Sequence, residues 1–463
     1  MGIVLKGGRI ITAADSYEAD IKIEGEKIVA IGDNLECEGD KVVSVAGCYL
    51  LPGGIDPHTH FDLDVGSTVT ADDFESGTRA AIVGGTTTII DFATQNKGET
   101  LKKALQNWNE KAKGKCYCDY GFHMAITDWN EDICNEMGDM IKEGVPSFKM
   151  YMAYKNTLQV DDGSIFRALK KSGEIGALIG FHCENGDVID VLVNEAKSKG
   201  NTSPKYHAET RPAEAEKEAV FRAIQLGELA SVPVYIVHLS SKEAFNIAME
   251  ARKRGAEVYL ETCPQYLLLN DSYYDPKGED EFSGAKYVMS PPLRKSDDQK
   301  ALWKGLKFNE IDTVATDHCS FNYKGQKDIG IKDFSKIPNG APGVENRMAL
   351  LYTYGVATGA ITENQWVSLT STNAAKLFGL FPQKGTIQVG SDADIVVWDP
   401  EYRGVITAEN QTQNVDYNPY EGFDQKGKVL HAFLRGGQVV ADSNIVSKVP
   451  DGIYLHRKPF SKK

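Results

Sequence analysis

The sequence lacks three features that would place it in a membrane or outside the cell. It has no run of about 18 apolar residues, so we expect no membrane-spanning helix. Its first 20 residues carry a charge every few positions, unlike a secretory signal peptide. Its eight cysteines are scattered and form no CxxC pair, which favours a reduced, cytoplasmic chain over a disulfide framework.

An excess of positive charge is missing as well. Lys and Arg number 51 against 65 Asp and Glu, a formal net charge of −14, which argues against broad nucleic-acid binding. Hydrophobic residues make up 41% of the chain and charged residues 25%, close to globular averages, so a disordered or fibrous protein is excluded. The 463 residues exceed one ordinary domain and suffice for an α/β barrel of about 250 residues with a smaller second domain.

The two ends of the chain share a strand-rich texture. Residues 1–51 contain short segments with a period of two, such as IVLKGG, RIITA and ADIKIEG, separated by Gly and Asp. Residues 381–445 repeat this texture in GTIQVGSDADIVVWDP and KVLHAFLRGGQVVADS. Because neither stretch is long enough for a two-sided core alone, we predict one small β-sandwich built from both termini. Residues 446–463, with Pro, Lys and Arg, are predicted to form a C-terminal arm.

The middle of the chain, residues 52–380, has the βαβ pattern of a parallel sheet. Short apolar runs alternate with amphipathic helical stretches such as 213–230. The runs number eight, and eight βα units close into an α/β TIM barrel. They are GGIDPHTHF (53–61), TTTIIDF (86–92), YGFHMA (120–125), SFKMYM (147–152), ALIGFHC (177–183), PVYIVHL (233–239), EVYLETC (257–263) and DTVATDH (312–318).

Several of the eight runs end in a residue that can bind a metal ion. His58 and His60 close the first run, His182 the fifth, His238 the sixth and Asp317 the eighth. Barrel enzymes carry their chemistry at the carboxyl ends of their strands, so we expect these side chains to converge. His58 and His60 are two positions apart and point to the same face of their strand. Imidazole suits metals such as zinc, so the whole set predicts a metal site, although a core position would explain each histidine alone.

Lys149 is the unusual member, because it lies in an otherwise apolar and aromatic fourth run. One interpretation is a buried ion pair with Asp91 or Glu261. The other is a desolvated amine with a lowered pKa that reacts with carbon dioxide. The resulting carbamate would offer two oxygen ligands. Together with four histidines and one aspartate, it would hold two metal ions about 3.5–4 Å apart with a hydroxide between them.

Other residues near these strand ends have alternative interpretations. Asp317, in the sequence TDH, would be either the N-cap of a following helix or a metal ligand and proton shuttle. We expect His318 to have a supporting or structural role and His123 to lie in the core. Cys183 and Cys319 lie beside the candidate ligands but lack a dedicated base, so we interpret them as packing residues. The histidines outside the strand ends are interpreted as ordinary: His207, His431 and His456.

The chain resembles the hydantoinase/dihydropyrimidinase branch of the cyclic amidohydrolases over nearly its whole length. The resemblance rests on PGGIDPHTHFD (52–62), SFKMYMAYKN (147–156), FHCEN (181–185), IVHLSS (236–241), ETCPQYL (261–267), MSPPLR (289–294), ATDHCSF (315–321), PNGAPGVENR (338–347) and NPYEGF (418–423). PGVENR and ATDHCSF are similar to the D-selective phenylhydantoinases in particular. The resemblance implies a TIM barrel with a β-sandwich from both termini, and commonly a homotetramer or homodimer.

The resemblance also implies a role for each candidate residue. Two divalent metal ions are implied, Zn2+ by preference, with Mn2+ or Co2+ as alternatives. Tyr154 would hydrogen-bond the oxyanion, and Ser290 and Asn339 would hold the cyclic amide, largely through backbone groups. The more buried metal would be bound by His58, His60, carboxylated Lys149 (N6-carboxylysine) and Asp317, and the more exposed one by Lys149, His182 and His238.

The reaction implied by these roles is hydrolysis of a cyclic amide. A bridging hydroxide would attack the carbonyl carbon of a ring –CO–NH– unit while one metal and Tyr154 polarise its oxygen. Asp317 would take the proton and deliver it to the leaving nitrogen. The substrates would be 5-monosubstituted hydantoins, with D-selectivity, or 5,6-dihydropyrimidines, and the products N-carbamoyl amino acids.

Single positions distinguish this chain from related functions in the same superfamily. Dihydroorotases typically place an arginine two positions after HxH, where this chain has Asp62, so a carboxylated substrate is disfavoured. A dihydropyrimidinase without hydantoinase activity stays open, and a non-catalytic scaffold is a remote alternative because every metal ligand is present. The resemblance points to Val65, Tyr151 and Leu158 as contacts of the 5-substituent, and we expect the pocket that they form to be roomy.

Overall fold

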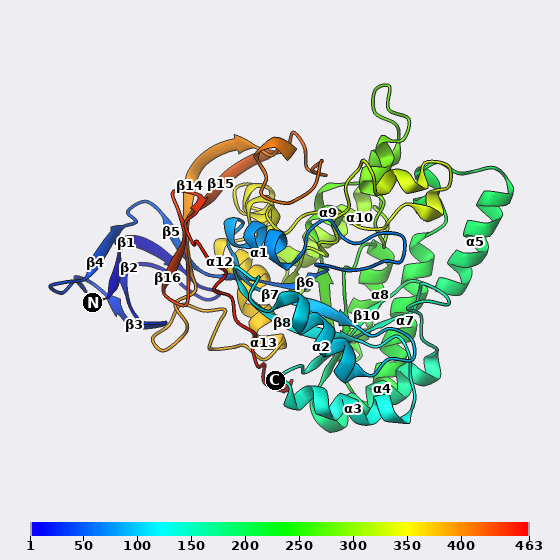
Figure 1. The fold of residues 1–463 in the computed structure, drawn as a ribbon, viewed down its shortest axis with the longest axis horizontal. Helices are drawn as coiled ribbons and strands as arrows, with labels where there is room; N and C mark the ends of the chain where they lie inside the picture. The colour runs from blue at the N-terminus through cyan, green and yellow to red at the C-terminus, as the bar shows by residue number, and fades with distance from the viewer. Residues whose placement is uncertain (1, 462–463) are drawn as a thin grey trace.

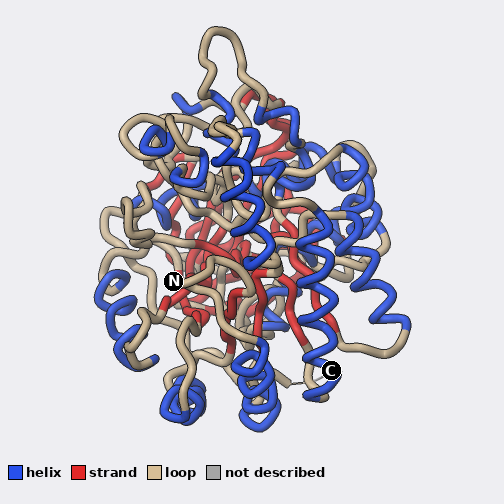
Figure 2. The backbone as a smooth tube through the Cα atoms, turned by 90° about the vertical axis from the view of Figure 1, so that its right-hand side faces the viewer, coloured by secondary structure: helices blue, strands red, loops and turns tan. Residues whose placement is uncertain are grey.

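The computed structural model describes residues 2–461 and contains two sheets that lie beside each other (Figure 1). An eight-stranded parallel sheet forms a barrel, and a nine-stranded mixed sheet combines strands from both ends of the chain. Figure 2 shows strands in the centre of the barrel half and helices around them. Within residues 2–461, none of the helices combines the length and apolar character that a membrane crossing requires.

The barrel strands follow one another in chain order, as the eight predicted runs require. The ring closes where the backbone N–H of His60 donates to the carbonyl of His318 at 2.8 Å, just beyond the last strand. All eight predicted strands are present, so the TIM barrel is confirmed. They are β6 (Gly54–Thr59), β7 (Thr86–Thr94), β8 (Asp119–Ala125), β9 (Ser147–Tyr151), β10 (Leu178–His182), β11 (Val234–Ile236), β12 (Val258–Thr262) and β13 (Thr313–Val314).

Polar side chains begin the helices that cover the barrel. The N-cap residues of seven described helices, among them Asp73, Asn130 and Ser241, accept hydrogen bonds from N–H groups of the first turn. The helix predicted over 213–230 is present with those bounds as α7. The helices are α1 (Phe74–Val83), α2 (Leu101–Ala112), α3 (Glu131–Lys142), α4 (Asp162–Ile175), α5 (Gly186–Ser198), α6 (Lys205–Glu209), α7 (Ala213–Ala230), α8 (Lys242–Lys253), α9 (Pro264–Leu268), α10 (Ser296–Lys307), α11 (Arg347–Leu351), α12 (Glu363–Val367) and α13 (Asn373–Leu377).

The second sheet joins the two ends of the chain, as the strand-rich texture predicts. Its centre is the antiparallel pair of β5 and β14, in which Leu51 lies opposite Val396. Ile21, in β2, and Phe433, in β15, lie toward opposite ends of the strand order but belong to one buried cluster. The sheet therefore curls around a core of its own. Its strands are β1 (Ile3–Ile11), β2 (Ser16–Glu24), β3 (Lys27–Gly32), β4 (Lys41–Ser44), β5 (Tyr49–Pro52), β14 (Ile395–Val405), β15 (Asp424–Leu434), β16 (Gly437–Ala441) and β17 (Asn444–Ile445).

One detail of the predicted strands is wrong. The segments IVLKGG and RIITA form the single strand β1 rather than two strands. The pairing of β1 with β2 shifts register between Leu5 and Gly8, and Gly7 has a φ of 77°. This is a β-bulge, which interrupts the side-chain alternation without ending the strand.

The C-terminal residues lie against the amino ends of the barrel strands. The N–H of Tyr120, in β8, donates to Ile453 at 3.0 Å, and the N–H of Leu455 donates to Tyr120 at 2.8 Å. The guanidinium of Arg457 is buried and donates to the carbonyl of Phe122 and to the hydroxyl of Ser147. These contacts cover the amino end of the barrel and leave the carboxyl end for chemistry.

Candidate active site

The histidines predicted from the strand ends lie together at the carboxyl end of the barrel. The ring centroid of His58 is 5.2 Å from that of His60 and 5.4 Å from that of His238, which is 4.8 Å from that of His182. Oδ1 of Asp317 lies 3.1 Å from Nε2 of His58 and 3.3 Å from Nε2 of His60. Two imidazoles and a carboxylate that converge on one point are a donor set suited to a divalent cation.

A second pair of donors faces the first group. Nδ1 of His182 and Nε2 of His238 lie 3.1 Å apart, and both rings are buried. Burial lowers the pKa of both histidines, so their rings are held neutral, the form that binds metals. The chemistry of this site therefore fits metal ions at both groups of donors.

Lys149 completes the cluster from the middle of β9. Its Nζ lies 4.9 Å from the ring centroid of Phe92, and that ring also stacks on His60 at 4.9 Å. Burial lowers the pKa of Lys149 to about 8. Within residues 2–461 Lys149 forms no ion pair, because Asp91 binds Thr59 and Phe61, and Glu261 binds His58. The ion-pair interpretation is therefore wrong for both carboxylates.

Two buried carboxylates that are not among the candidate ligands hold the imidazoles in place. Oε1 of Glu261 is 2.6 Å from Nδ1 of His58 and accepts the backbone N–H of His238 at 3.0 Å. Oε2 of Glu184 is 2.9 Å from Nε2 of His182 and 2.8 Å from Arg211. Such partners fix the ring orientation and basicity of metal-binding histidines. Only Glu184 has a signal in the sequence, since it follows the candidate ligand His182 by two positions.

Three candidate site residues have a left-handed backbone that L-residues rarely adopt. The φ angles are 66° at Tyr154, 39° at His238 and 52° at Asp317. Each such conformation costs about 1–3 kcal/mol and persists where the surrounding structure imposes it, commonly at functional sites. Of these three strained positions, His238 and Asp317 are candidate ligands and Tyr154 lies next to them.

The alternatives for the residues around Asp317 are resolved. No helix starts at Asp317, since the next helical turn is the 3-10 helix η3 (Lys327–Gly330), so the N-cap interpretation is wrong. Burial raises the pKa of Asp317, but His58 and His60 outweigh it and hold that pKa well below its ordinary value. His318 binds Asp72 through Nε2 at 3.0 Å and accepts the N–H of Gly343, so its structural role is confirmed. His123 is buried in the core, as expected, where its ring nitrogens contact the hydroxyl of Ser147 and the carbonyl of Pro57.

The candidate substrate contacts lie on loops that border the ligands. The ring of Tyr154 is 5.0 Å from that of His182, and its hydroxyl hydrogen-bonds the side chain of Ser290. Burial raises the pKa of Tyr154 to about 12 although Arg211 opposes the shift, so the hydroxyl keeps its proton at neutral pH. The loop with Asn339 meets the loop with Ser290 where the N–H of Gly340 donates to Val288 at 3.0 Å.

The residues predicted for the 5-substituent lie on the loop after β6, at the end of β9 and on the loop that follows β9. Val65 is exposed on the loop that follows β6. Tyr151 is buried at the end of β9, and its ring centroid is 6.1 Å from that of Tyr154. Leu158 is half-buried on the same loop as Tyr154 and donates its N–H to the Tyr154 carbonyl at 3.1 Å.

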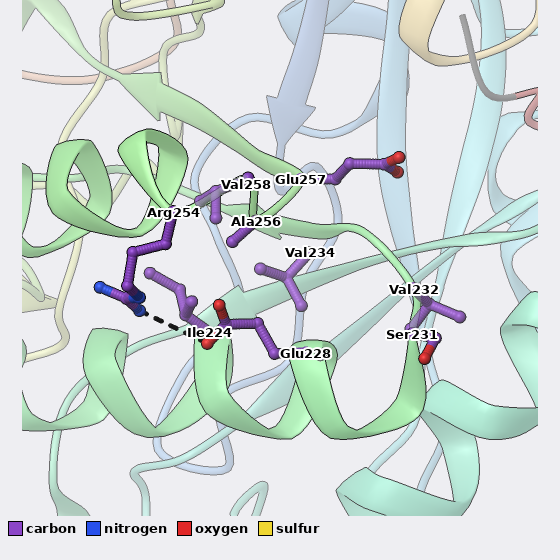
Figure 3. A pocket seen from close by; sticks show the side chains of 11 residues that line it. Ile224, Glu228, Ser231, Val232, Val234, Arg254, Ala256, Glu257 and Val258 are labelled. Carbon is purple, nitrogen blue, oxygen red and sulfur yellow. Dashed lines mark hydrogen bonds and ion pairs between the residues drawn. The ribbon is translucent and has the colours of Figure 1, made fainter.

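A surface pocket of about 260 Å³ lies at the opposite end of the strands (Figure 3). It is bounded by the end of α7 and by the residues before β11 and β12, including Val232 and Ala256. Arg254 and Glu228 form an ion pair of 3.4 Å at its edge. None of the candidate site residues lines this pocket.

Comparison with known proteins agrees with this geometry. Residues 49–439 match the amidohydrolase family. A D-hydantoinase from Geobacillus stearothermophilus is 51% identical over 99% of this chain and 97% of its own. A D-phenylhydantoinase from Escherichia coli (strain SE11) is 41% identical over 99% of both chains. The crystal structure of dihydropyrimidinase from Brevibacillus agri NCHU1002 superposes with a TM-score of 0.98 at 49% identity and covers 100% of both chains. This chain therefore belongs to the amidohydrolase family, in the branch that contains the hydantoinases and dihydropyrimidinases.

Proposed function

We propose that this protein is a metal-dependent hydrolase that opens the ring of 5-monosubstituted hydantoins, with D-selectivity, and of 5,6-dihydropyrimidines. The observation that carries the proposal is the gathering of four imidazoles, a carboxylate and a desolvated lysine at the carboxyl end of the barrel. Relatives named D-hydantoinase and D-phenylhydantoinase, with nearly the same length, support it. A dihydropyrimidinase without hydantoinase activity is the second candidate, favoured by the likeness to the Brevibacillus structure.

The proposed cofactor is a pair of divalent cations, Zn2+ by preference. We assign one to His58, His60, carboxylated Lys149 and Asp317, and the other to Lys149, His182 and His238. Cations of this kind supply an activated water and polarise the carbonyl that it attacks. A lysine amine whose pKa is lowered to about 8 by burial supports carboxylation, because the neutral amine is the form that reacts with carbon dioxide.

The protein's own side chains orient the substrate and move the proton. Tyr154 keeps its proton and donates a hydrogen bond to the carbonyl oxygen as negative charge develops there. Asp317 is ionised, so its carboxylate can accept a proton and deliver it to the ring nitrogen that leaves. Ser290 and Asn339 hold the amide through backbone groups. The ring opens to an N-carbamoyl amino acid.

The surroundings of the reaction are proposed from the same family. A homotetramer, or a homodimer, in the cytoplasm is the expected state. For the 5-substituent we propose contacts with Val65, Tyr151 and Leu158. The exposed position of Val65 supports this assignment, because the side chain is accessible to a substituent.

Intact mass and metal content of one purified sample test the proposal first. Under mild, non-acidic conditions we expect about two zinc ions per chain and a mass increased by one CO₂, which a Lys149→Met variant lacks. The loaded protein should open dihydrouracil and D-phenylhydantoin. A sample purified without chelator that holds no metal and opens neither ring would refute the proposal.

A further inference from the structure

Two buried basic side chains outside the metal cluster bind the loops that border the substrate site. Lys327 begins the 3-10 helix η3, and His207 lies in the short helix α6. Lys327 is 0% exposed and His207 is 3% exposed. Neither residue lies at a strand end, and neither has a role in the metal cluster.

Lys327 links two loops that are distant in sequence. Its Nζ donates to the carbonyl of Val288 and to the carbonyl of Pro338, both at 3.0 Å. Within residues 2–461 it forms no ion pair, and burial lowers its pKa to about 7. Burying an amine without a carboxylate partner lowers the stability of the folded protein. We therefore expect the reason for its two contacts with carbonyl groups to lie in the function of the site.

The geometry of the peptide group supplies that reason. The carbonyl of Pro338 and the N–H of Asn339 belong to one planar peptide unit, in which they point in opposite directions. Because Lys327 holds the carbonyl, the N–H of Asn339 is directed away from the buried amine. The carbonyl of Val288 also accepts the N–H of Gly340 at 3.0 Å, which ties the two loops to each other.

His207 acts on the neighbouring peptide unit in the same way. Its Nε2 lies 2.8 Å from the carbonyl of Met289, whose peptide unit carries the N–H of Ser290. An imidazole nitrogen that faces a carbonyl at this distance must carry its proton and donate it. The direction of the Ser290 N–H is therefore set by His207.

The two N–H groups fixed in this way are free. Within the described part of the chain, neither the N–H of Ser290 nor that of Asn339 donates to a protein group. Ser290 is 7% exposed, and backbone N–H groups that are buried in proteins almost always have a partner. Two oriented donors without a protein acceptor are suited to a carbonyl oxygen of a bound ligand.

We infer that His207 and Lys327 are positioning residues for the ring of the substrate, since they orient the Ser290 and Asn339 N–H groups toward it. The inference rests on the proposed function, in which Ser290 and Asn339 hold the cyclic amide. It adds two residues that act through the backbone of those contacts and touch neither the metals nor the reacting atoms.

Steady-state kinetics on the metal-loaded protein test the inference. Lys327→Met should raise KM for dihydrouracil about tenfold and change kcat less than about twofold, because these contacts are made in the ground state and in the transition state alike. Lys327→Arg keeps donors at this position and should recover most of the loss. His207→Gln provides a second variant if Lys327→Met does not fold.

A matched control separates positioning from stability. Arg252 also donates to two carbonyls, those of Val258 at 2.7 Å and Glu310 at 2.6 Å. It differs in that it also pairs with Asp312 and lies at the amino ends of β12 and β13. Arg252→Met should lower the melting temperature and leave KM unchanged. An unchanged KM in Lys327→Met, or an equal rise in KM in Arg252→Met, would overturn the inference.

Hydrogen exchange distinguishes failure of this inference from failure of the proposed function. Wild-type protein that opens no cyclic amide would refute the proposed function. Even then, residues 286–292 and 336–342 should exchange their amide hydrogens faster in Lys327→Met than in wild type or in Arg252→Met. Equal exchange rates in both segments would show that Lys327 does not hold the two loops.

Discussion

The carboxylate of Glu261 lies 2.6 Å from Nδ1 of His58, and both side chains are completely buried. The same carboxylate accepts the backbone N–H of His238 at 3.0 Å and the hydroxyl of Tyr235 at 2.7 Å. One carboxylate therefore orients two candidate ligands that come from different strands. It also requires that Nδ1 of His58 carry the proton, which leaves Nε2 for a metal ion.

Removing the charge of Glu261 tests this arrangement. Glu261→Gln is expected to weaken metal binding about 10- to 100-fold, because a neutral amide oxygen replaces the charged acceptor that orients the imidazole of His58 and raises its basicity. Zinc retained after dialysis against a graded chelator series measures the effect. Glu250→Gln, which removes an exposed carboxylate on α8, is the control and should retain zinc like wild type. Equal retention in both variants would contradict the role of Glu261.

The hydroxyl of Tyr154 should matter for the chemical step. Tyr154→Phe is expected to lower kcat about 100- to 1,000-fold, the usual loss when one donor to a developing oxyanion is removed. Zinc content should stay at the wild-type value, because Tyr154 is not among the proposed ligands. The prediction fails if kcat changes by less than about threefold in a variant that retains its metal.

Substrate choice should depend on the loop after β6. Val65→Phe is expected to lower kcat/KM for D-phenylhydantoin at least about tenfold more than for dihydrouracil, because the larger ring occupies space needed by the 5-substituent. Val69 lies on the same loop and is 42% exposed, as is Val65, so Val69→Phe is a matched control. Equal losses on the two substrates would exclude Val65 from the pocket.

Glu345 gives the stability a dependence on pH. Its Oε2 accepts the N–H groups of Thr412, at 2.6 Å, and Gln413, at 3.1 Å, from the connection between β14 and β15. Burial raises the pKa of Glu345 from 4.5 to about 7, although these donors oppose the shift. The folded protein therefore keeps this proton at pH values where the unfolded chain has lost it. The contribution to stability is complete below about pH 4.5 and is lost as the pH rises through about 7.

A neutral substitute should remove that dependence. Glu345→Gln is expected to be more stable than wild type by about 1–3 kcal/mol at pH 8.5, with a smaller difference at pH 5.5. Urea unfolding at the two pH values measures it. Glu409→Gln, at an exposed position of the same connection, should behave like wild type at both. A difference that does not change with pH would refute the titration of Glu345.

The candidate ligands are predictable from the sequence, whereas the residues that support them are not. His182 and His238 were found because each ends a buried run, and the ends of parallel strands meet at one edge. Asp317 was found in the same way, although β13 ends at Val314 and Asp317 lies beyond it in a left-handed turn. The apolar runs in the sequence show where each buried strand lies, and the residue at which a run stops marks the end of the strand.

The residues that support the ligands and the substrate loops have no such pattern in the sequence. Lys327 meets a carbonyl 39 positions earlier in the chain, and Glu261 meets an imidazole 203 positions earlier. Such contacts depend on how loops cross in three dimensions, which no local pattern of side chains encodes. His207 looked ordinary for the same reason, since its partner, Met289, is a backbone carbonyl and leaves no mark in the sequence.

The antiparallel pairing of β5 with β14 has a consequence for synthesis on the ribosome. Pro52 lies opposite Ile395, so about 340 residues separate the two partners along the chain, and at 5–20 residues per second these take roughly 20–70 s to make. Throughout that interval the side of β5 that β14 will cover is an open strand edge, the kind of surface on which chains aggregate. Newly made protein is therefore most vulnerable after its first 52 residues have emerged and before the strands that cover them exist.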